Sequence, residues 1–417
     1  MSEHRYRSVV AIGALAIMLA MSGCSGESTG ESAGQSATES VTDPAQMLRE
    51  ALLSAKPGST ITIPSGHLHF DRSLSLEVDG VTLKGSGSAT SLLDFSGQLA
   101  GAEGLLVTGR DVTLEGFAVL DARGDAIKMN QCENLVVRDV RTEWTGGPKS
   151  TNGAYGLYPV QCNGVLIEDS TAIGASDAGI YVGQSQNIIV RRNQVAFNVA
   201  GIEIENSTQA DVYENNVVDN TGGILVFDLP DLPVQGGRQT RVFDNTLAHN
   251  NTANFAPEGN IVGTVPAGTG IMVNANDDIE IFGNTITDHQ TAAVLVVSYL
   301  ITGRPLDDPD YDPFPEKISV HHNVILKTGY APDSEPLANL KAATELESLP
   351  AIIWDGFLAP GQTDPVVCAH DNGDLGTVAL DAPNGFAAPD FSGAAFECEL
   401  PALPAVMLTS ATMAPGH

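Results

Sequence analysis

Basic side chains are scarce in this chain of 417 residues, which has 20 Lys and Arg against 51 Asp and Glu. The formal net charge of −31 repels phosphate backbones and other polyanions unless cations bridge them, so nucleic acid is not an expected partner. Cysteine is also rare, with five residues, and no CxxC or His and Cys spacing indicates a zinc site. What is abundant is apolar side chain, 42% of the sequence, which is enough for a large folded core.

The first residues have the layout of an export signal. Arg5 and Arg7 precede an apolar run over 9–21 that is too short to span a bilayer. The ending before Cys24 resembles a bacterial lipobox, which implies cleavage before Cys24 and a lipid on that cysteine. Ser25 then implies sorting to the outer membrane or the cell surface. An ordinary signal peptide with a chance cysteine is the alternative.

A repeat of about 22 residues dominates the rest of the chain. Short strands of alternating apolar residues begin at a small residue, and successive starts lie mostly 22 or 23 residues apart. The starts are Gly104, Ala126, Gly156, Gly179, Gly201, Gly223, Gly270 and a degenerate Ala293. Such a period is typical of a solenoid, in which each coil buries its apolar face against its neighbours. The pattern over 43–55 predicts a short helix that covers the open first coil.

Asparagines form a second register in these repeats. Asn193, Asn215 and Asn284 each lie 14 residues after their anchor glycine, and Asn245 and Asn323 have the same local sequence context. Stacked amides can bond one another in turns, so this register predicts a structural ladder.

The cysteines after Cys24 are even in number, which favours disulfides in an exported chain. Cys132 and Cys162 both lie six residues after the start of their strand, so they occupy the same place on successive coils. Stacked strands are about 4.8 Å apart, which is within reach of a disulfide, and two free thiols are the alternative. Cys368 and Cys398 are then predicted to close the C-terminal region.

Segments such as NFAPEGNIVGTVPAGTGIMVNANDDIEIFGNTI resemble an exported right-handed parallel β-helix family that has paired β-helix repeats and often a lipoprotein signal. The resemblance covers about 43–330 and implies an all-β, single-stranded, pectate lyase-like solenoid with a short N-terminal capping helix. It also implies a possible partner, a second exported protein that is encoded beside it. More distantly the chain is similar to the pectate lyase and mannuronan C5-epimerase superfamily. The predicted organisation is a signal at 1–23, a flexible tether at 24–42, the β-helix at 43–330 and a C-terminal extension of a helix, a strand and an irregular tail at 331–417.

Four insertions depart from the period, and all border the anchor strand. Those at 145–154 and 250–267 precede such a strand, and those at 229–237 and 299–315 follow one. Insertions of a solenoid map to loops on one face, often the binding face, although they also gather wherever turns are loose.

Period-two alternation predicts which anchor-strand side chains point outward between these loops. One outward column contains Lys128, Tyr158, Tyr181 and Glu203, and a second contains Asn130, Glu205 and Asn274. Tyrosines with amides and carboxylates suit a sugar chain, so this wall is predicted to bind a polysaccharide or another envelope partner. The residues predicted to contact the carbohydrate are Asn130, Tyr158, Tyr181, Asp228 and Asn274.

The same wall permits three catalytic interpretations. Glu203 and Glu205 lie about 6.6 Å apart along a strand, which suits an inverting glycoside hydrolase. Lys128 or Tyr158 could serve as the base of a uronate lyase or C5-epimerase, with Glu203 as a hydrogen-bond partner. Epimerase-like proteins carry a YGxDPHD-type segment with catalytic Asp and His, whereas this chain has YGLYPVQ at 155–161. Outward glutamates of a solenoid are usually solvated. Binding is favoured over catalysis, because the placement of the loops supports a binding surface while the known catalytic patterns are missing.

Two further groups have residue types that bind metals. The loop at 307–313 contains Asp307, Asp308, Asp310 and Asp312, which could bind calcium or simply be solvated. His67 and His69 share one face of a strand, but the sequence shows no third ligand for them.

Overall fold

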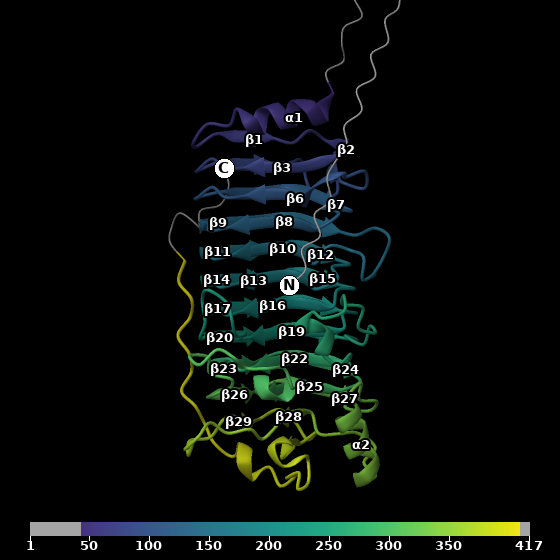
Figure 1. Ribbon diagram of the computed structural model, residues 1–417, viewed down its shortest axis with the longest axis vertical. Helices are drawn as coiled ribbons and strands as arrows, with labels where there is room; N and C mark the ends of the chain where they lie inside the picture. The colour runs from purple at the N-terminus through teal and green to yellow at the C-terminus, as the bar shows by residue number, and fades with distance from the viewer. Residues whose placement is uncertain (1–42, 409–417) are drawn as a thin grey trace, which may run out of the picture. The chain divides into compact units, whose positions relative to one another are not determined.

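The computed structural model describes residues 43–408, and they form a stack of parallel β coils (Figure 1). The predicted signal, Cys24 and tether lie outside the described residues. No helix among the described residues is long and apolar enough to cross a membrane.

One wall of the stack is an 11-stranded sheet in which every strand pairs in parallel with the equivalent strand of the next coil. Its strands contain the predicted anchor segments. They are β3 (Arg72–Leu76), β6 (Ala100–Val107), β8 (Asp125–Asn130), β10 (Tyr155–Val160), β13 (Ala178–Gly183), β16 (Ala200–Glu205), β19 (Gly222–Phe227), β22 (Thr269–Asn274), β25 (Ala292–Val297), β28 (Ile352–Trp354) and β30 (Thr377–Ala379).

The other strands form a 19-stranded sheet that consists of two stacks of strands and bends round the coils. The long strands β7 and β9 take part in both stacks and join them into one sheet, as β9 does by pairing with β11 and with β12. These strands are β1 (Thr60–Thr62), β2 (Gly66–His69), β4 (Thr82–Lys84), β5 (Ser91–Asp94), β7 (Thr113–Leu120), β9 (Glu133–Glu143), β11 (Asn163–Glu168), β12 (Thr171–Ile173), β14 (Gln186–Arg191), β15 (Gln194–Ala196), β17 (Thr208–Tyr213), β18 (Asn216–Val218), β20 (Arg238–Phe243), β21 (Thr246–Ala248), β23 (Asp277–Phe282), β24 (Thr285–His289), β26 (Ile318–His321), β27 (Val324–Thr328) and β29 (Val367–His370).

The core lies inside the coils, where aliphatic side chains stack from one coil to the next. Ile180, Ile202, Ile224 and Ile271 are in register on neighbouring strands and are all fully buried. The first coil is covered by α1 (Pro44–Leu53), whose Ala45, Leu48 and Leu52 are buried. The Asp43 side chain accepts a hydrogen bond from the Ala45 N–H at 3.0 Å and caps this helix. The predicted capping helix is confirmed.

Hydrogen-bonded asparagines line one corner of the stack. The side-chain nitrogen of Asn193 donates to the Asn215 Oδ1 at 2.9 Å, and the same bond is repeated along the corner. The ladder continues through Asn245, Asn284, Asn323 and Asn372. Each member also accepts from a backbone N–H of the preceding coil, as Asn215 does from Asn193 at 3.0 Å. The predicted ladder is confirmed and extends one coil further than predicted.

Both predicted disulfides are present. Cys132 and Cys162 are joined on successive coils with their Cα atoms 4.5 Å apart, and Cys368 is joined to Cys398. Parallel pairing continues past residue 330, where the sequence analysis places the end of the β-helix, because β28, β29 and β30 pair with the coils before them. The helix α2 (Glu335–Thr344) lies within this later part.

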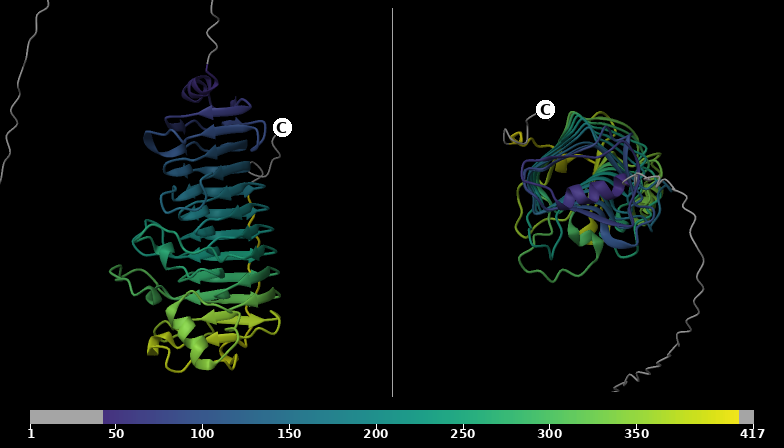
Figure 2. Two further views of the ribbon diagram at one scale, coloured as in Figure 1. Left: turned by 90° about the vertical axis from the view of Figure 1, so that its right-hand side faces the viewer. Right: turned by 90° about the horizontal axis from the view of Figure 1, so that it is seen from above.

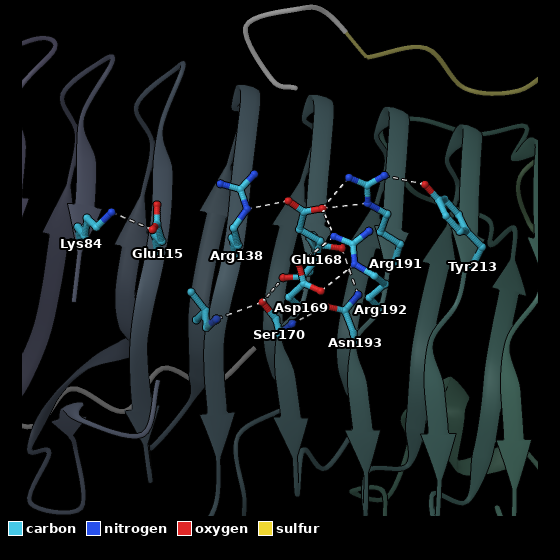
Figure 3. Close-up of polar contacts among 12 residues, drawn as sticks. Lys84, Glu115, Arg138, Glu168, Asp169, Ser170, Arg191, Arg192, Asn193 and Tyr213 are labelled. Atoms are coloured by element: carbon cyan, nitrogen blue, oxygen red, sulfur yellow. Dashed lines mark hydrogen bonds and ion pairs between the residues drawn. The ribbon is translucent and has the colours of Figure 1, made fainter. Parts of the chain in front are cut away.

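An ion-pair network holds neighbouring coils together on the outer face of the 19-stranded sheet (Figure 3). Arg138, Arg191 and Arg192 approach the Glu168 carboxylate with nitrogen to oxygen distances of 2.6–2.7 Å. Burial acts to raise the pKa of Glu168, but hydrogen bonds from these arginines hold it below its ordinary value. The carboxylate therefore stays charged and links three successive coils.

Candidate functional site

Loops project from one side of the coils, and they border the outer face of the 11-stranded sheet (Figure 2). The loop between β21 and β22 contains the short helix η1 (Ile261–Thr264). Its Val262 and Val265 are buried in one apolar cluster with Tyr181 and Leu225 of the sheet. This loop therefore covers part of the predicted wall.

The side chains on this wall follow the predicted columns. Tyr158 is in register with Lys128 on the preceding coil, and Tyr181 with Glu203 on the following coil. Glu205 pairs with Gly183 in the second column. Alternation thus predicts the register correctly, and the structure brings all five residues of the wall together along β8 to β16.

The acidic part of the wall is not solvated. Glu203 is 1% exposed, Glu205 7% and Tyr181 4%, whereas Lys128, Asn130 and Tyr158 are half-buried. The interpretation of these glutamates as solvated surface is therefore wrong. It fails because the loop over β16 and β19 removes the water that an outward side chain of a bare coil would meet.

Three tyrosine rings pack together at the edge of this covered region. The centroid of the Tyr155 ring lies 4.5 Å from that of the Tyr158 ring and 4.6 Å from that of the Tyr181 ring. The Lys128 Nζ lies 4.9 Å from the centre of the Tyr158 ring, on the side away from Tyr181 along the column. The tyrosines thus form an aromatic platform with a cation at its end.

Gly183 allows Tyr181 to reach the acids. The Tyr181 hydroxyl donates to the Glu205 Oε1 at 2.6 Å, and the ring crosses Gly183 on the way. A Cβ atom at Gly183 would overlap the Tyr181 hydroxyl oxygen, so any larger residue would force the tyrosine ring to move. The missing side chain is required for the Tyr181 to Glu205 contact.

Three buried carboxyls lie beneath the platform, namely Asp177, Glu203 and Glu205. Asp177 immediately precedes β13, is 5% exposed, and accepts from the Asn260 side chain of the covering loop at 3.3 Å. Neither carboxyl oxygen of Glu203 has a hydrogen-bond partner among the described residues. Within 43–408, none of the three carboxyls is in an ion pair with a basic side chain. We call these three acids, with Tyr155, Tyr158 and Tyr181, the tyrosine–carboxylate cluster.

Burial without counter-ions shifts the acids toward their neutral forms. It raises the pKa of Asp177 to about 7, with the charge of Glu205 adding to the rise. Burial also raises the pKa of Glu205 to about 7, against the lowering effect of the Tyr181 hydrogen bond. The pKa of Glu203 lies well above its ordinary value for the same reason, reinforced by the charges of Glu205 and Asp177. At neutral pH the group therefore holds protons that ordinary carboxylates would have released.

Two half-buried residues complete the rim of the cluster. Asp125 accepts from the Tyr155 N–H at 3.3 Å, and burial raises its pKa to about 6. Burial raises the pKa of Tyr158 to about 12, so its hydroxyl is a weaker candidate for a general base than the sequence suggests.

Two of the residues predicted to contact carbohydrate lie outside the tyrosine–carboxylate cluster. Asp228 is 2% exposed and accepts from the backbone N–H groups of Gly236 and Gly237, so it closes the 228–237 loop. Its carboxylate is bonded to the loop backbone and is shielded from solvent. Asn274 is 2% exposed, and its Oδ1 has no partner among the described residues.

Asn274 instead lines a cavity of about 290 Å³ on the far side of the covering loop. The walls are mostly apolar and include residues of the covering loop, β22, β25, α2 and the segment 380–386, and Asp355 is the one charged residue type among the lining residues. Burial raises the pKa of Asp355 to about 7, but backbone N–H groups of Ser298 and Phe357 hold it in place. This cavity is separate from the tyrosine–carboxylate cluster.

The acidic loop at 307–313 has its carboxylates spread apart. No three of the carboxylates of Asp307, Asp308, Asp310 and Asp312 converge among the described residues. The Asp308 carboxylate accepts from the Gln235 side chain and the Asp310 N–H, and Asp312 accepts from the Phe314 N–H. Local turns orient these carboxylates apart, so the solvated alternative fits the loop.

Tyr155, Asp177 and Asn260 belong to the site but are not predicted from the sequence. Tyr155 begins β10 and lies one position before the anchor Gly156, and Asp177 directly precedes β13 and lies two positions before the anchor Gly179. These places just before the anchor glycines are a signal that could have found them. Asn260 lies in an insertion, and only the folded loop shows where its side chain points.

Residues 79–238 match the family model described as the right handed beta helix region, and the chain matches no curated protein. Among solved structures it is similar to an alginate lyase from Paenibacillus sp. str. FPU-7, at 17% identity over 69% of this chain and 96% of that chain, with a TM-score of 0.44. It is also similar to the catalytic unit of a GH87 alpha-1,3-glucanase from Streptomyces thermodiastaticus strain HF3-3, at 16% identity over 75% of this chain and 47% of that chain, with a TM-score of 0.45. A DFA-IIIase from Arthrobacter chlorophenolicus A6 shows 12% identity over 79% of this chain and 88% of that chain, with a TM-score of 0.43. The fold that the chain adopts is a right-handed parallel β-helix.

Proposed function

We propose that the tyrosine–carboxylate cluster binds a polysaccharide and hydrolyses it, with Asp177 and Glu205 as the proton-transferring pair. The observation that carries this proposal is the burial of adjacent carboxyls without any basic partner among the described residues. Glycoside hydrolysis needs one carboxylic acid and one carboxylate at the same pH. Asp177 and Glu205 both have pKa values of about 7, and the charge of Glu205 raises the pKa of Asp177. Near neutral pH the pair therefore supplies one protonated and one charged carboxyl.

The rim supplies the surface on which a sugar chain would lie. Tyr155 and Tyr158 present half-buried rings, and Lys128, Asn130 and Asp125 add hydrogen-bonding groups beside them. Aromatic faces with a few converging polar groups are typical of carbohydrate sites. The chain would run across β8 to β13, with Asp177 and Glu205 beneath it.

The charge of the cluster favours a neutral glycan. Asp125, Asp177, Glu203 and Glu205 gather here, and Lys128 is the only basic side chain of the wall. A uronate would bring a further carboxylate into this group, and its charge would have to be neutralised. Glu203, which the sequence pairs with Glu205, is fully enclosed, so in this proposal Asp177 takes that place.

A uronate lyase or C5-epimerase is the second candidate, because Lys128 lies over the exposed side of Tyr158 and could serve as the base. The protonated form of an enclosed acid such as Glu203 would then act as a hydrogen-bond partner rather than as a charge. Binding without chemistry is the third candidate, and the tyrosine platform alone would support it.

The experiment is incubation of the protein with neutral and uronate glycans, with product analysis. We expect new reducing ends from a neutral glycan and a loss of rate of about 10²–10⁴-fold in Asp177→Asn and in Glu205→Gln. Glu280→Gln, which changes a buried glutamate on the other sheet, is the matched control and should keep the rate. Unsaturated products from a uronate would establish the lyase, and saturable retention with no product would establish the binding protein.

We also propose, from residues 1–25, an exported protein that is lipid-anchored through Cys24 at the outer membrane or cell surface. The polar tether would let the β-helix reach extracellular glycan or a co-encoded exported partner. Incorporation of labelled fatty acid that disappears in Cys24→Ala is the expected result, and unchanged labelling would contradict the anchor.

A further inference from the structure

His67 and His69 meet a third metal-ligating side chain that the sequence does not reveal. Both histidines lie on β2, and His69 is in register with Asp94 on β5 of the next coil. The His67 Nε2 lies 2.7 Å and the His69 Nδ1 3.2 Å from the same oxygen, the Asp94 Oδ2. One nitrogen from each ring and one carboxylate oxygen therefore converge on a single point.

The carboxylate is held in place by the fold. The Asp94 side chain is 9% exposed, and its Oδ1 accepts from the Ser96 N–H at 2.7 Å. This bond leaves the Oδ2 directed toward the two imidazoles. The side chains of His67 and His69 are 48% and 71% exposed, so the side opposite the carboxylate is open to solvent.

A second group of the same composition provides a comparison. His322, His370 and Asp371 also converge, with the Asp371 Oδ2 at 3.1 Å from the His370 Nδ1 and 3.7 Å from the His322 Nε2. Here the carboxylate is 67% exposed and the His370 ring is stacked on His321. The first group therefore has the better prepared carboxylate, and the second serves as its control.

We propose that His67, His69 and Asp94 bind a divalent transition-metal ion of the Zn²⁺ type. Zinc is bound by histidine nitrogen at about 2.0–2.1 Å and by carboxylate oxygen at about 2.0–2.2 Å. Tetrahedral bonds of that length place two donor atoms about 3.3 Å apart. The two imidazole nitrogens lie 2.7 and 3.2 Å from the Asp94 Oδ2, so small rotations of the exposed rings would make room for the ion. Imidazole ligands favour such ions over calcium or magnesium, which prefer oxygen.

The metal would link the first two complete coils beneath α1. β2 and β5 are neighbours in the 19-stranded sheet, and ligands from both would be held by one ion. A ligand that binds only the folded state raises its stability. The proposed site lies on a different sheet from the tyrosine–carboxylate cluster and does not depend on its function.

The test is titration of the metal-free full-length protein with Zn²⁺ by calorimetry, and with Co²⁺ by visible absorption. We expect a saturable site, tetrahedral Co²⁺ bands and a higher Tm with zinc. Loss of an outer-shell partner alone weakens metal sites 10–100-fold, so His67→Ala and His69→Ala should each weaken this site by about 100-fold or more. Both residues are exposed, and unchanged circular dichroism would show that the variants fold.

The control is the double substitution His322→Ala and His370→Ala, which should leave the site intact. If wild-type protein binds two equivalents, one must persist in this control and disappear in His69→Ala. No saturable binding, or binding that is lost in the control and kept in His69→Ala, would overturn the proposal.

Discussion

The hydrogen bond from Tyr181 to Glu205 can be tested through its dependence on pH. A hydrogen bond to a neutral group contributes about 0.5–1.5 kcal/mol to stability and one to a charged group about 1.5–3 kcal/mol. Tyr181→Phe removes only the hydroxyl, because the ring remains packed on Tyr155 and Tyr158. At pH 5, where Glu205 with its pKa of about 7 is neutral, we expect a loss of about 1 kcal/mol. At pH 9, where it is charged, the loss should reach about 2–3 kcal/mol.

The sign follows from linkage. The folded pKa of Glu205 is raised from 4.5 to about 7, so its contribution to stability is complete below pH 4.5 and falls as the pH rises toward 7. The Tyr181 hydroxyl lowers that pKa. Its removal should therefore raise the pKa by about one unit and extend the fall to higher pH, since one unit corresponds to about 1.4 kcal/mol.

The assay is urea unfolding at pH 5, 7 and 9, together with a carboxyl carbon NMR titration of Glu205. Tyr213→Phe is the matched control, because its hydroxyl accepts from Arg191 and contacts no carboxyl that titrates in this range. Its effect should be the same at all three pH values. A loss in Tyr181→Phe that does not grow with pH, or a Glu205 pKa near 4.5 in the wild type, would show that Tyr181 does not donate to a buried carboxyl of raised pKa.

Further predictions concern the same architecture. Replacing Cys132 and Cys162 by alanine opens a loop of 30 residues and should cost about 3–4 kcal/mol in urea unfolding; an unchanged midpoint would contradict the loop-entropy estimate. Glu168→Ala leaves three arginines without their shared carboxylate and should destabilise by about 3–5 kcal/mol, and Glu168→Gln by less, in the same assay. Gly183→Ala should displace Tyr181, cost about 1–3 kcal/mol and reproduce the raised Glu205 pKa in the NMR titration. Because Asp177, Asp277 and Asp355 have pKa values raised from 3.8 to about 7, the Tm should fall as the pH rises from 4 to 7 and level off above it.

The sequence predicts most of the wall because the features that decide it are local. Side chains alternate strictly along a strand, so the outward direction of Tyr158, Tyr181 and Glu203 follows once each strand is located. Equal spacing on successive coils likewise identified the Cys132 and Cys162 pair and the asparagine ladder. Each of these features depends on the period alone.

The environment of the wall could not be predicted, because it depends on where irregular segments fold. The loop between β21 and β22 returns over β13 to β19, the anchor strands one to three coils before β22, and this contact buries Glu203. Asp94 joins His67 and His69 through a register between β2 and β5 in coils that lack the regular period. The acidic loop is the converse case, because Asp307 and its neighbours are close in sequence but no three of their carboxylates converge among the described residues.

The acids of the cluster are not needed by the β-helix itself. In the same two columns the next coil has Leu225 beside Glu203 and Phe227 beside Glu205, and both apolar side chains are fully buried under the covering loop. Apolar residues therefore fill this covered face without the cost of desolvating a carboxyl. One coil earlier the same face has two glutamates, and Tyr181 bonds to one of them across Gly183, where any larger residue would displace the Tyr181 ring. The fold holds acids without ion pairs where apolar residues would be more stable, which supports the role that we propose for them. The pH dependence of Tyr181→Phe tests whether those acids are held neutral as the proposal requires.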